Sequence, residues 1–179
     1  MHGHTTRDCA PLSEWQAFQA ANPDIQAIDA FIIDLNGHAT GKRLPAADGT
    51  KLYKEGVMYS ACALIADSRG LGHNAGGMGQ SDGDPDGIAR PLSGFLQRVP
   101  WTATPTAQVV CQMTDLGEGK ELWFDPRRIL ADVVAKCRAA GLYPVVACEL
   151  EFYLVDPKRK PDGGLALGAL PGRAPPRRA

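Results

Sequence analysis

The stretch Tyr143-Pro-Val-Val-Ala-Cys-Glu-Leu-Glu-Phe-Tyr-Leu-Val-Asp156 is the most informative part of this 179-residue chain. It is apolar and rich in β-branched and aromatic residues, a composition that predicts a β-strand. Because side chains alternate between the two faces of a strand, Glu149 and Glu151 would lie side by side on one face. The other residues on that face are apolar: Val145, Ala147, Tyr153 and Val155.

The pair Glu149 and Glu151 allows two interpretations. Two carboxylates on a half-buried strand are costly, because each loses hydration and they repel one another. In the first interpretation they lie on the solvated face of an antiparallel sheet, beside Lys or Arg. In the second they hold a hard divalent cation, Mg²⁺ or Mn²⁺, whose shell is completed by waters and substrate phosphates. The apolar neighbours favour the second, but the residues by themselves leave both open.

Upstream of this stretch, the pattern predicts a small α+β domain. A helix over 14–21, with Ser13 as its N-cap, would bury Trp15, Phe18 and Ala21. The segments that follow are a strand over 27–35, a turn at Asn36-Gly37, a return strand through 41–45, a helix over 49–55 that ends at Gly56, and a third strand over 57–66.

The second half of that domain begins with residues 67–90, which are dominated by Gly, Asp, Ser and Asn. Since they lack the Gly-Lys-Ser/Thr ending of a phosphate-binding loop, we expect an exposed functional flap. Asp82, Asp84 and Asp86 are interpreted as solvated turn residues, because Gly83 and Pro85 interrupt any calcium-loop pattern. A strand over 108–114 follows.

A second helix is predicted from Asp125-Pro126 to about residue 140. Asp125 is suited to the N-cap, Pro126 to the first helical position and Gly141 to the C-terminal stop. Its apolar residues recur at helical spacing and form the expected buried stripe, namely Ile129, Leu130, Val133, Val134 and Cys137.

Composition narrows the functional class. Residues 1–157 hold 13 Lys and Arg against 19 Asp and Glu, and residues 158–179 hold 6 against 1. An acidic body gives no reason to expect nucleic acid as a partner. No apolar run suggests a membrane span and no signal-like start suggests secretion, so we expect a cytoplasmic protein.

The five cysteines are odd in number and lack a Cys-x-x-Cys pair, which predicts reduced residues, with Cys111, Cys137 and Cys148 as core fillers. The first eleven residues contain His2, His4 and Cys9. Their spacing does not fit a metal site, and we expect a flexible N-terminus there.

Several blocks of this chain resemble the glutamine synthetase family in order and spacing. They are Asp34-Leu-Asn-Gly37, Gly41-Lys-Arg-Leu-Pro45, Pro91 through Pro100-Trp101, the helix start Asp125-Pro126-Arg127, and Glu149-Leu-Glu151-Phe-Tyr-Leu. The resemblance covers roughly residues 25 to 157. In the residues of these motifs, it is closest to the γ-glutamylputrescine (polyamine) synthetase branch.

The resemblance implies a fold of class α+β, with a small β-grasp-like N-terminal domain and the truncated start, helix plus strand, of a catalytic domain. The expected divisions are an N-terminal segment with a short helix at 1–24, the β-grasp-like domain at 25–118, the incomplete catalytic domain at 119–157 and a disordered basic tail at 158–179. The strand over 143–155 needs partners that the residues after it cannot supply. We therefore expect a truncated or frame-shifted version of a longer protein.

The resemblance also implies an activity, ATP-dependent ligation of the glutamate γ-carboxyl to an amine through γ-glutamyl phosphate. Glu149 would help to hold the Mg²⁺ or Mn²⁺ that bridges the ATP phosphates, and Glu151 the metal beside the glutamate carboxyl. The catalytic and nucleotide-binding residues lie downstream in the family and are not assigned here. Family members form homo-oligomeric rings, expected to be dodecamers, whose active sites are shared between subunits. This chain is therefore expected to be inactive by itself.

The amine is suggested by one departure from the family pattern. Ammonia-using relatives carry Asp-Gly-Ser-Ser after the third strand to help bind ammonium, whereas this chain reads Tyr59-Ser-Ala-Cys-Ala63. Without a carboxylate in that block, putrescine or a similar polyamine is favoured. The alternatives are a glutamine synthetase proper that uses ammonia, and a non-catalytic β-grasp assembly or binding module.

Overall fold

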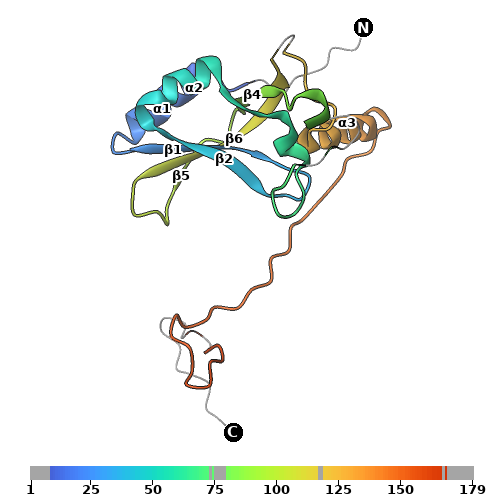
Figure 1. Cartoon of the computed structure of the whole chain (residues 1–179). Helices are drawn as coiled ribbons and strands as arrows, with labels where there is room; N and C mark the ends of the chain where they lie inside the picture. The colour runs from blue at the N-terminus through green and yellow to red at the C-terminus, as the bar shows by residue number, and fades with distance from the viewer. Residues whose placement is uncertain (1–8, 73, 75–79, 117–118, 167, 169–179) are drawn as a thin grey trace. The chain divides into compact units, whose positions relative to one another are not determined.

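The computed structural model describes residues 9–72, 74, 80–116, 119–166 and 168 (Figure 1). They divide into two compact units, one within residues 1–143 and one within 144–179, and each is considered by itself. The helices and strands, all in the first unit, are α1 (Leu12–Ala21), β1 (Ala27–Ile33), β2 (Ala39–Pro45), α2 (Gly49–Glu55), β3 (Val57–Ser60), β4 (Asp86–Pro91), β5 (Gln97–Val99), β6 (Thr106–Asp115) and α3 (Pro126–Ala139). Three short 3-10 helices lie at Ala46–Asp48 (η1), Ala61–Ile65 (η2) and Gln80–Asp82 (η3).

A six-stranded mixed sheet organises the first unit. Its order is β2-β1-β6-β4-β3, with β5 also beside β6. The long strand β6 runs parallel to β1 over Thr106–Val110 and antiparallel to β4 over Cys111–Asp115. The predicted α+β class is therefore confirmed, whereas the β-grasp description is not.

The core lies on the sheet face that α1 and α2 cover (Figure 1). Alternation along β1 and β6 buries every second side chain, as expected for strands with one packed face. The largest fully buried side chains include Trp15, Ile28, Ile32, Leu52, Leu64, Val109 and Met113. Each such burial stabilises the fold by roughly 1.5–3 kcal/mol.

The first hairpin and α2 form as predicted. Gly37 adopts φ +79° in the turn, and β2 returns antiparallel to β1 in the register Ala27 to Pro45. Helix α2 spans Gly49–Glu55 and is followed by Gly56 at φ +78°. Both turns depend on glycine because other residues rarely adopt positive φ.

Helix α1 differs from the prediction at its start and on its buried side. It begins at Leu12, directly after Pro11, and Ser13 makes no cap. Pro11 has φ −70° with an extended ψ, so the helix can start at the next residue. Trp15 is buried and Phe18 half-buried, but Ala21 is exposed at the last turn, where the predicted stripe was wrong.

The N-terminal segment is attached to the sheet from Cys9 onward. Cys9 forms an isolated bridge with Leu92, and the Ala10 N–H donates to the Pro91 carbonyl at 2.8 Å. Ala10 is also buried, so the expected flexible segment was wrong for residues 9–11. His2 and His4 lie outside the described residues.

Two segments between residues 57 and 91 have boundaries in the structure that differ from the predicted ones. The third strand ends at Ser60 instead of residue 66, because the Ala61 N–H bonds to the Pro85 carbonyl and the chain turns into η2. The expected flap ends earlier, since residues 86–91 form β4 between β3 and β6. Gly87 permits this pairing, because a Cβ there would lie 2.6 Å from Met113 Sδ. Residues 73 and 75–79 of the flap lie outside the described residues.

Helix α3 has the predicted ends but not the predicted burial. The Asp125 carboxylate accepts from the Arg127 N–H at 2.8 Å, and Gly141 has φ +74°. Of the expected buried stripe, Ile129, Leu130 and Val133 are exposed, while Val134 and Cys137 are half-buried. The stripe was predicted from periodicity, but no described element covers it.

The strand predicted over residues 143–156 does not form. Residues 143–154 carry no regular secondary structure, and Val145, Val146 and Leu150 are 95%, 83% and 83% exposed. A strand needs a neighbour for its backbone hydrogen bonds, and only the end of this stretch has one. There the Asp156 N–H donates to the Ala166 carbonyl at 2.8 Å, and the Gly168 N–H to the Leu154 carbonyl at 2.8 Å.

The described part of the basic tail, residues 158–166 and 168, contains a turn. The Gly163 N–H donates to the Lys160 carbonyl at 2.9 Å, and the Lys160 N–H to the Gly164 carbonyl at 3.0 Å. Residues 167 and 169–179 of the expected disordered tail lie outside the described residues. The expected start of the catalytic domain at residue 119 stays a prediction.

The cysteines are partly where we expected them. Cys111 is buried, and burial raises the pKa of its thiol to about 12. Cys137 is half-buried, and Cys148 is exposed because its stretch has no partner. Cys62, not predicted as a core residue, is buried. No helix among the described residues is long and apolar enough to span a membrane.

Candidate functional site

The candidate site residues fall into two groups. The block Tyr59–Ala63 lies at the end of β3 and in η2, in the first unit. Glu149 and Glu151 belong to the second unit, and the two groups are therefore described separately.

The turn after β1 is built on Asp34, which is only 3% exposed. Its carboxylate Oδ1 accepts from the backbone N–H groups of Asn36 and His38, each at 2.8 Å. Burial acts to raise the pKa of Asp34, but these hydrogen bonds outweigh it and the pKa is lowered. Asp34 therefore serves as the ionised centre of the turn.

The turn after β1 also makes hydrogen bonds to the residues that follow the block Tyr59–Ala63. The Leu35 N–H donates to the Leu64 carbonyl at 2.9 Å, and Asn36 Nδ2 to the Ala66 carbonyl at 2.8 Å. The residues of the Asp34-Leu-Asn-Gly37 block thus have a structural role, because they fix η2 against the hairpin.

Strand β2 holds the start of the block. Lys42 Nζ donates to the Met58 carbonyl at 2.7 Å and lies 4.9 Å from the centroid of the Tyr59 ring, a cation–π contact. Gly41 opposes Phe31, and a Cβ at Gly41 would lie 2.4 Å from the Ala30 carbonyl oxygen. The Gly41-Lys42 pair is therefore explained by packing and support of β3.

Tyr59 is the buried anchor of the block. Its hydroxyl donates to the Ala30 carbonyl at 2.8 Å, and the side chain is only 8% exposed. Burial raises the pKa of Tyr59 to about 12, so the phenol stays neutral and keeps its proton for this bond.

Ser60 is joined to a carboxylate that lies far away in the sequence. Its Oγ donates to Asp84 Oδ1 at 2.5 Å. Asp84 has φ +48°, in the left-handed region, and its N–H bonds to Asp82 Oδ1 at 3.2 Å. Ser60 and Asp84 line a pocket of about 360 Å³, together with Cys62 and Ala63.

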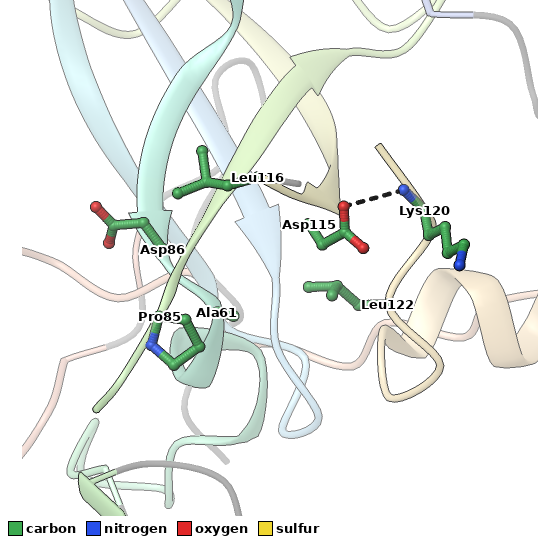
Figure 2. A pocket seen from close by; sticks show the side chains of 7 residues that line it. All are labelled: Ala61, Pro85, Asp86, Asp115, Leu116, Lys120 and Leu122. Carbon is green, nitrogen blue, oxygen red and sulfur yellow. Dashed lines mark hydrogen bonds between the residues drawn. The ribbon is translucent and has the colours of Figure 1, made fainter. Parts of the chain in front are cut away.

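A second pocket, of about 450 Å³, is lined by one residue of the block, Ala61 (Figure 2). Its walls combine apolar residues with two carboxylates and a lysine: Ala61, Pro85, Asp86, Asp115, Leu116, Lys120 and Leu122. The Asp115 carboxylate accepts from the Lys120 backbone N–H at 3.2 Å. Ala61 faces this pocket, whereas Ser60 and Cys62 line the first.

Asp84 is the site residue that sequence reasoning missed. We found no carboxylate in the block itself and treated Asp84 as a solvated turn residue. The available signal was the run of acids at 82, 84 and 86, but only the fold brings Asp84 to Ser60, 24 residues away. A carboxylate and a hydroxyl that line a pocket provide acceptors for a cationic group.

The structure does not bring Glu149 and Glu151 into an assembled centre. Both are exposed. Among the described residues, no ion pair involves them, and no group of three or more His, Cys, Asp or Glu could hold a metal ion. Neither interpretation of the pair is therefore tested, and metal binding stays a prediction.

Comparison with known proteins finds relatives among γ-glutamylputrescine synthetases and glutamine synthetases. No family model matches the chain. It is 35% identical over 168 residues to the γ-glutamylputrescine synthetase PuuA of Escherichia coli K12, which spans 93% of this chain and 35% of that protein. It is 23% identical over 138 residues to a glutamine synthetase of Mycolicibacterium smegmatis, over 75% of this chain and 28% of that protein. The chain thus spans about a third of the curated relatives it matches.

Solved structures show a similar fold. One titled as a GmaS complex with ADP has a TM-score of 0.53 at 22% identity, over 69% of this chain and 25% of that one. A glutamine synthase homologue has a TM-score of 0.53 at 18% identity, over 65% and 27%. At these identities the likeness concerns the fold alone.

Proposed function

From the premise that this chain is homologous to the ligases of the glutamine synthetase family, we propose that it is part of an ATP-dependent ligase joining the glutamate γ-carboxyl to an amine. The observation that carries the proposal is the 35% identity to a γ-glutamylputrescine synthetase over 93% of the chain. The identity to a glutamine synthetase is lower, 23% over 75% of the chain. This difference supports an organic amine, putrescine or a similar polyamine, as the substrate.

We propose that the amine substrate binds in the pocket lined by Ser60 and Asp84. Our sequence argument for an organic amine rested on a block without a carboxylate. With Asp84 beside Ser60, the block has an acceptor for an ammonium group after all. A pocket of about 360 Å³ is much larger than ammonium needs, which supports a diamine held by one charged end.

Glu149 and Glu151 are proposed to hold Mg²⁺ or Mn²⁺. Their chemistry fits, because hard cations take carboxylate oxygens, and Mg²⁺ is commonly held by one or two carboxylates plus waters and substrate phosphates. When bound, the cations would neutralise charge on the phosphoryl group during transfer. In this proposal the carboxylates of this chain hold the cations in place.

The rest of the active site is proposed to come from elsewhere. The chain spans about a third of its curated relatives, and no nucleotide-binding residues are assigned in it. We propose assembly into a ring in which the site is shared between subunits. This chain by itself would then release no phosphate from ATP.

A chimera tests the proposal. This chain replaces the aligned third of the E. coli γ-glutamylputrescine synthetase, and phosphate release from ATP is measured with glutamate and either putrescine or ammonium. Faster release with putrescine is expected. The reverse order would support a glutamine synthetase proper, and an assembled chimera without release with either amine would support the non-catalytic module.

A further inference from the structure

The turn after β1 contains the pair Asn36-Gly37, and both residues are exposed. Gly37 has φ +79°, and no other atom lies within 4 Å of the position that a Cβ would occupy there. An asparagine followed by glycine is especially prone to deamidation, because glycine has no side chain to hinder attack by its backbone nitrogen on the preceding amide. At this pair the chain can change its own covalent structure without an enzyme.

The fold holds both reacting groups in other hydrogen bonds. Asn36 Nδ2 donates to the Ala66 carbonyl at 2.8 Å, and the Gly37 N–H donates to the Asp34 carbonyl at 3.0 Å. The buried Asp34 carboxylate fixes the same turn, since it accepts from the backbone N–H groups of Asn36 and His38. The Gly37 nitrogen must lose its proton before it can attack, so the turn has to open first.

We propose that Asn36 is a deamidation site whose reaction is slowed by this turn. The inference does not rest on the proposed ligase activity. In the first step a base removes the proton of the Gly37 nitrogen, and this nitrogen forms a bond with Asn36 Cγ. The bond from Cγ to Nδ2 breaks, and the nitrogen takes up a proton from water and leaves as ammonia. A second water molecule then opens the resulting succinimide ring to aspartate or isoaspartate, and no oxidant is needed.

The reaction has a structural consequence for the pocket lined by Ser60 and Asp84. Its product lacks the N–H donor that Asn36 provides to the Ala66 carbonyl, and the new carboxylate repels that carbonyl oxygen. Ala66 is one of the residues that line the pocket. Deamidation therefore releases one wall of the pocket from the hairpin.

Peptide mapping by mass spectrometry tests the first part of the proposal. The whole chain is incubated at mildly alkaline pH, folded and in urea, and a peptide of residues 32–40 corrects for the effect of urea on the chemical step. Asn36 should convert about tenfold more slowly in the folded chain, as expected when one or two hydrogen bonds must break first. Asn22 is the internal control, because Pro23 has no N–H and cannot attack it.

A variant links this protection to the turn itself. Asp34→Asn replaces the carboxylate with a neutral oxygen that accepts hydrogen bonds less strongly, so Asn36 should convert faster in this folded variant than in the unchanged chain. Glu55→Gln removes an exposed acid of α2 and should leave the rate unchanged.

Hydrogen exchange tests the structural consequence. The Leu35 N–H, which donates to the Leu64 carbonyl at 2.9 Å, reports the contact between the hairpin and η2. Asn36→Asp has the same side chain as one product, and its Leu35 amide should exchange about tenfold faster, whereas Glu55→Gln should leave this exchange unchanged. Equal conversion of Asn36 in the folded and unfolded chains would overturn the proposed protection. Unchanged exchange at Leu35 in Asn36→Asp would overturn the proposed release of the pocket wall.

Discussion

Ser60 donates a 2.5 Å hydrogen bond to Asp84, and this contact places a carboxylate beside a block that has none in its own sequence. Both residues line the same pocket, so Asp84 is the natural acceptor for a cationic group that enters it.

Asp84→Asn should weaken binding of a diamine in the chimera. The amide has no charge to attract an ammonium group, and we expect the KM for putrescine to rise about tenfold, the size of one charge-assisted contact. Steady-state phosphate release measures it. Asp48→Asn removes another exposed acid, which lines neither pocket, and should leave the KM unchanged. Equal KM values for the two variants would exclude Asp84 as the amine acceptor.

Tyr59→Phe should destabilise the first unit by about 1–2 kcal/mol, because it removes a buried hydrogen bond from the phenol to the Ala30 carbonyl. Tyr53→Phe is the matched control, since the Tyr53 hydroxyl is buried and has no hydrogen-bond partner in the described structure. Its loss should be neutral or slightly stabilising. Urea denaturation of both variants measures the difference, and equal losses would contradict the assigned bond.

Asp34 should contribute to the loss of stability in acid. Its pKa is lowered in the folded state, since hydrogen bonds from the backbone of His38 and Asn36 outweigh burial. A lowered pKa stabilises the fold above the unfolded value of 3.8, and this contribution is lost as the pH falls through the folded value. Asp34→Asn should therefore be least destabilising in strong acid. Urea midpoints of both proteins from neutral to acidic pH test this, and a constant difference would contradict it.

Glu149→Gln and Glu151→Gln should each weaken Mn²⁺ binding by at least about tenfold, the lower end of the loss seen when a metal site is disturbed. Isothermal titration calorimetry of the chimera measures the affinity for Mn²⁺. Glu55→Gln, an exposed acid of α2, is the control. Unchanged affinity in both site variants would leave the carboxylates without a metal role.

Elements with local signals were predictable from sequence. The turn at Gly37, helix α2 with Gly56, and the capped start of α3 at Asp125 each depend on residues within a few positions of one another. Hydrophobic alternation was sufficient for β1 and for most of β6. Ser13 was misassigned because Pro11 decided where α1 begins.

The amino-acid sequence by itself determined the hairpin, the helices and the kinship with one family of ligases, since these follow from short-range residue patterns. Only the tertiary structure decided that residues 86–91 join the sheet, that Asp84 reaches Ser60, and that no described element covers the apolar stripe of α3. The physical reason is that burial and strand pairing need a second surface. Whether that surface is present depends on the rest of the fold, which no local pattern encodes.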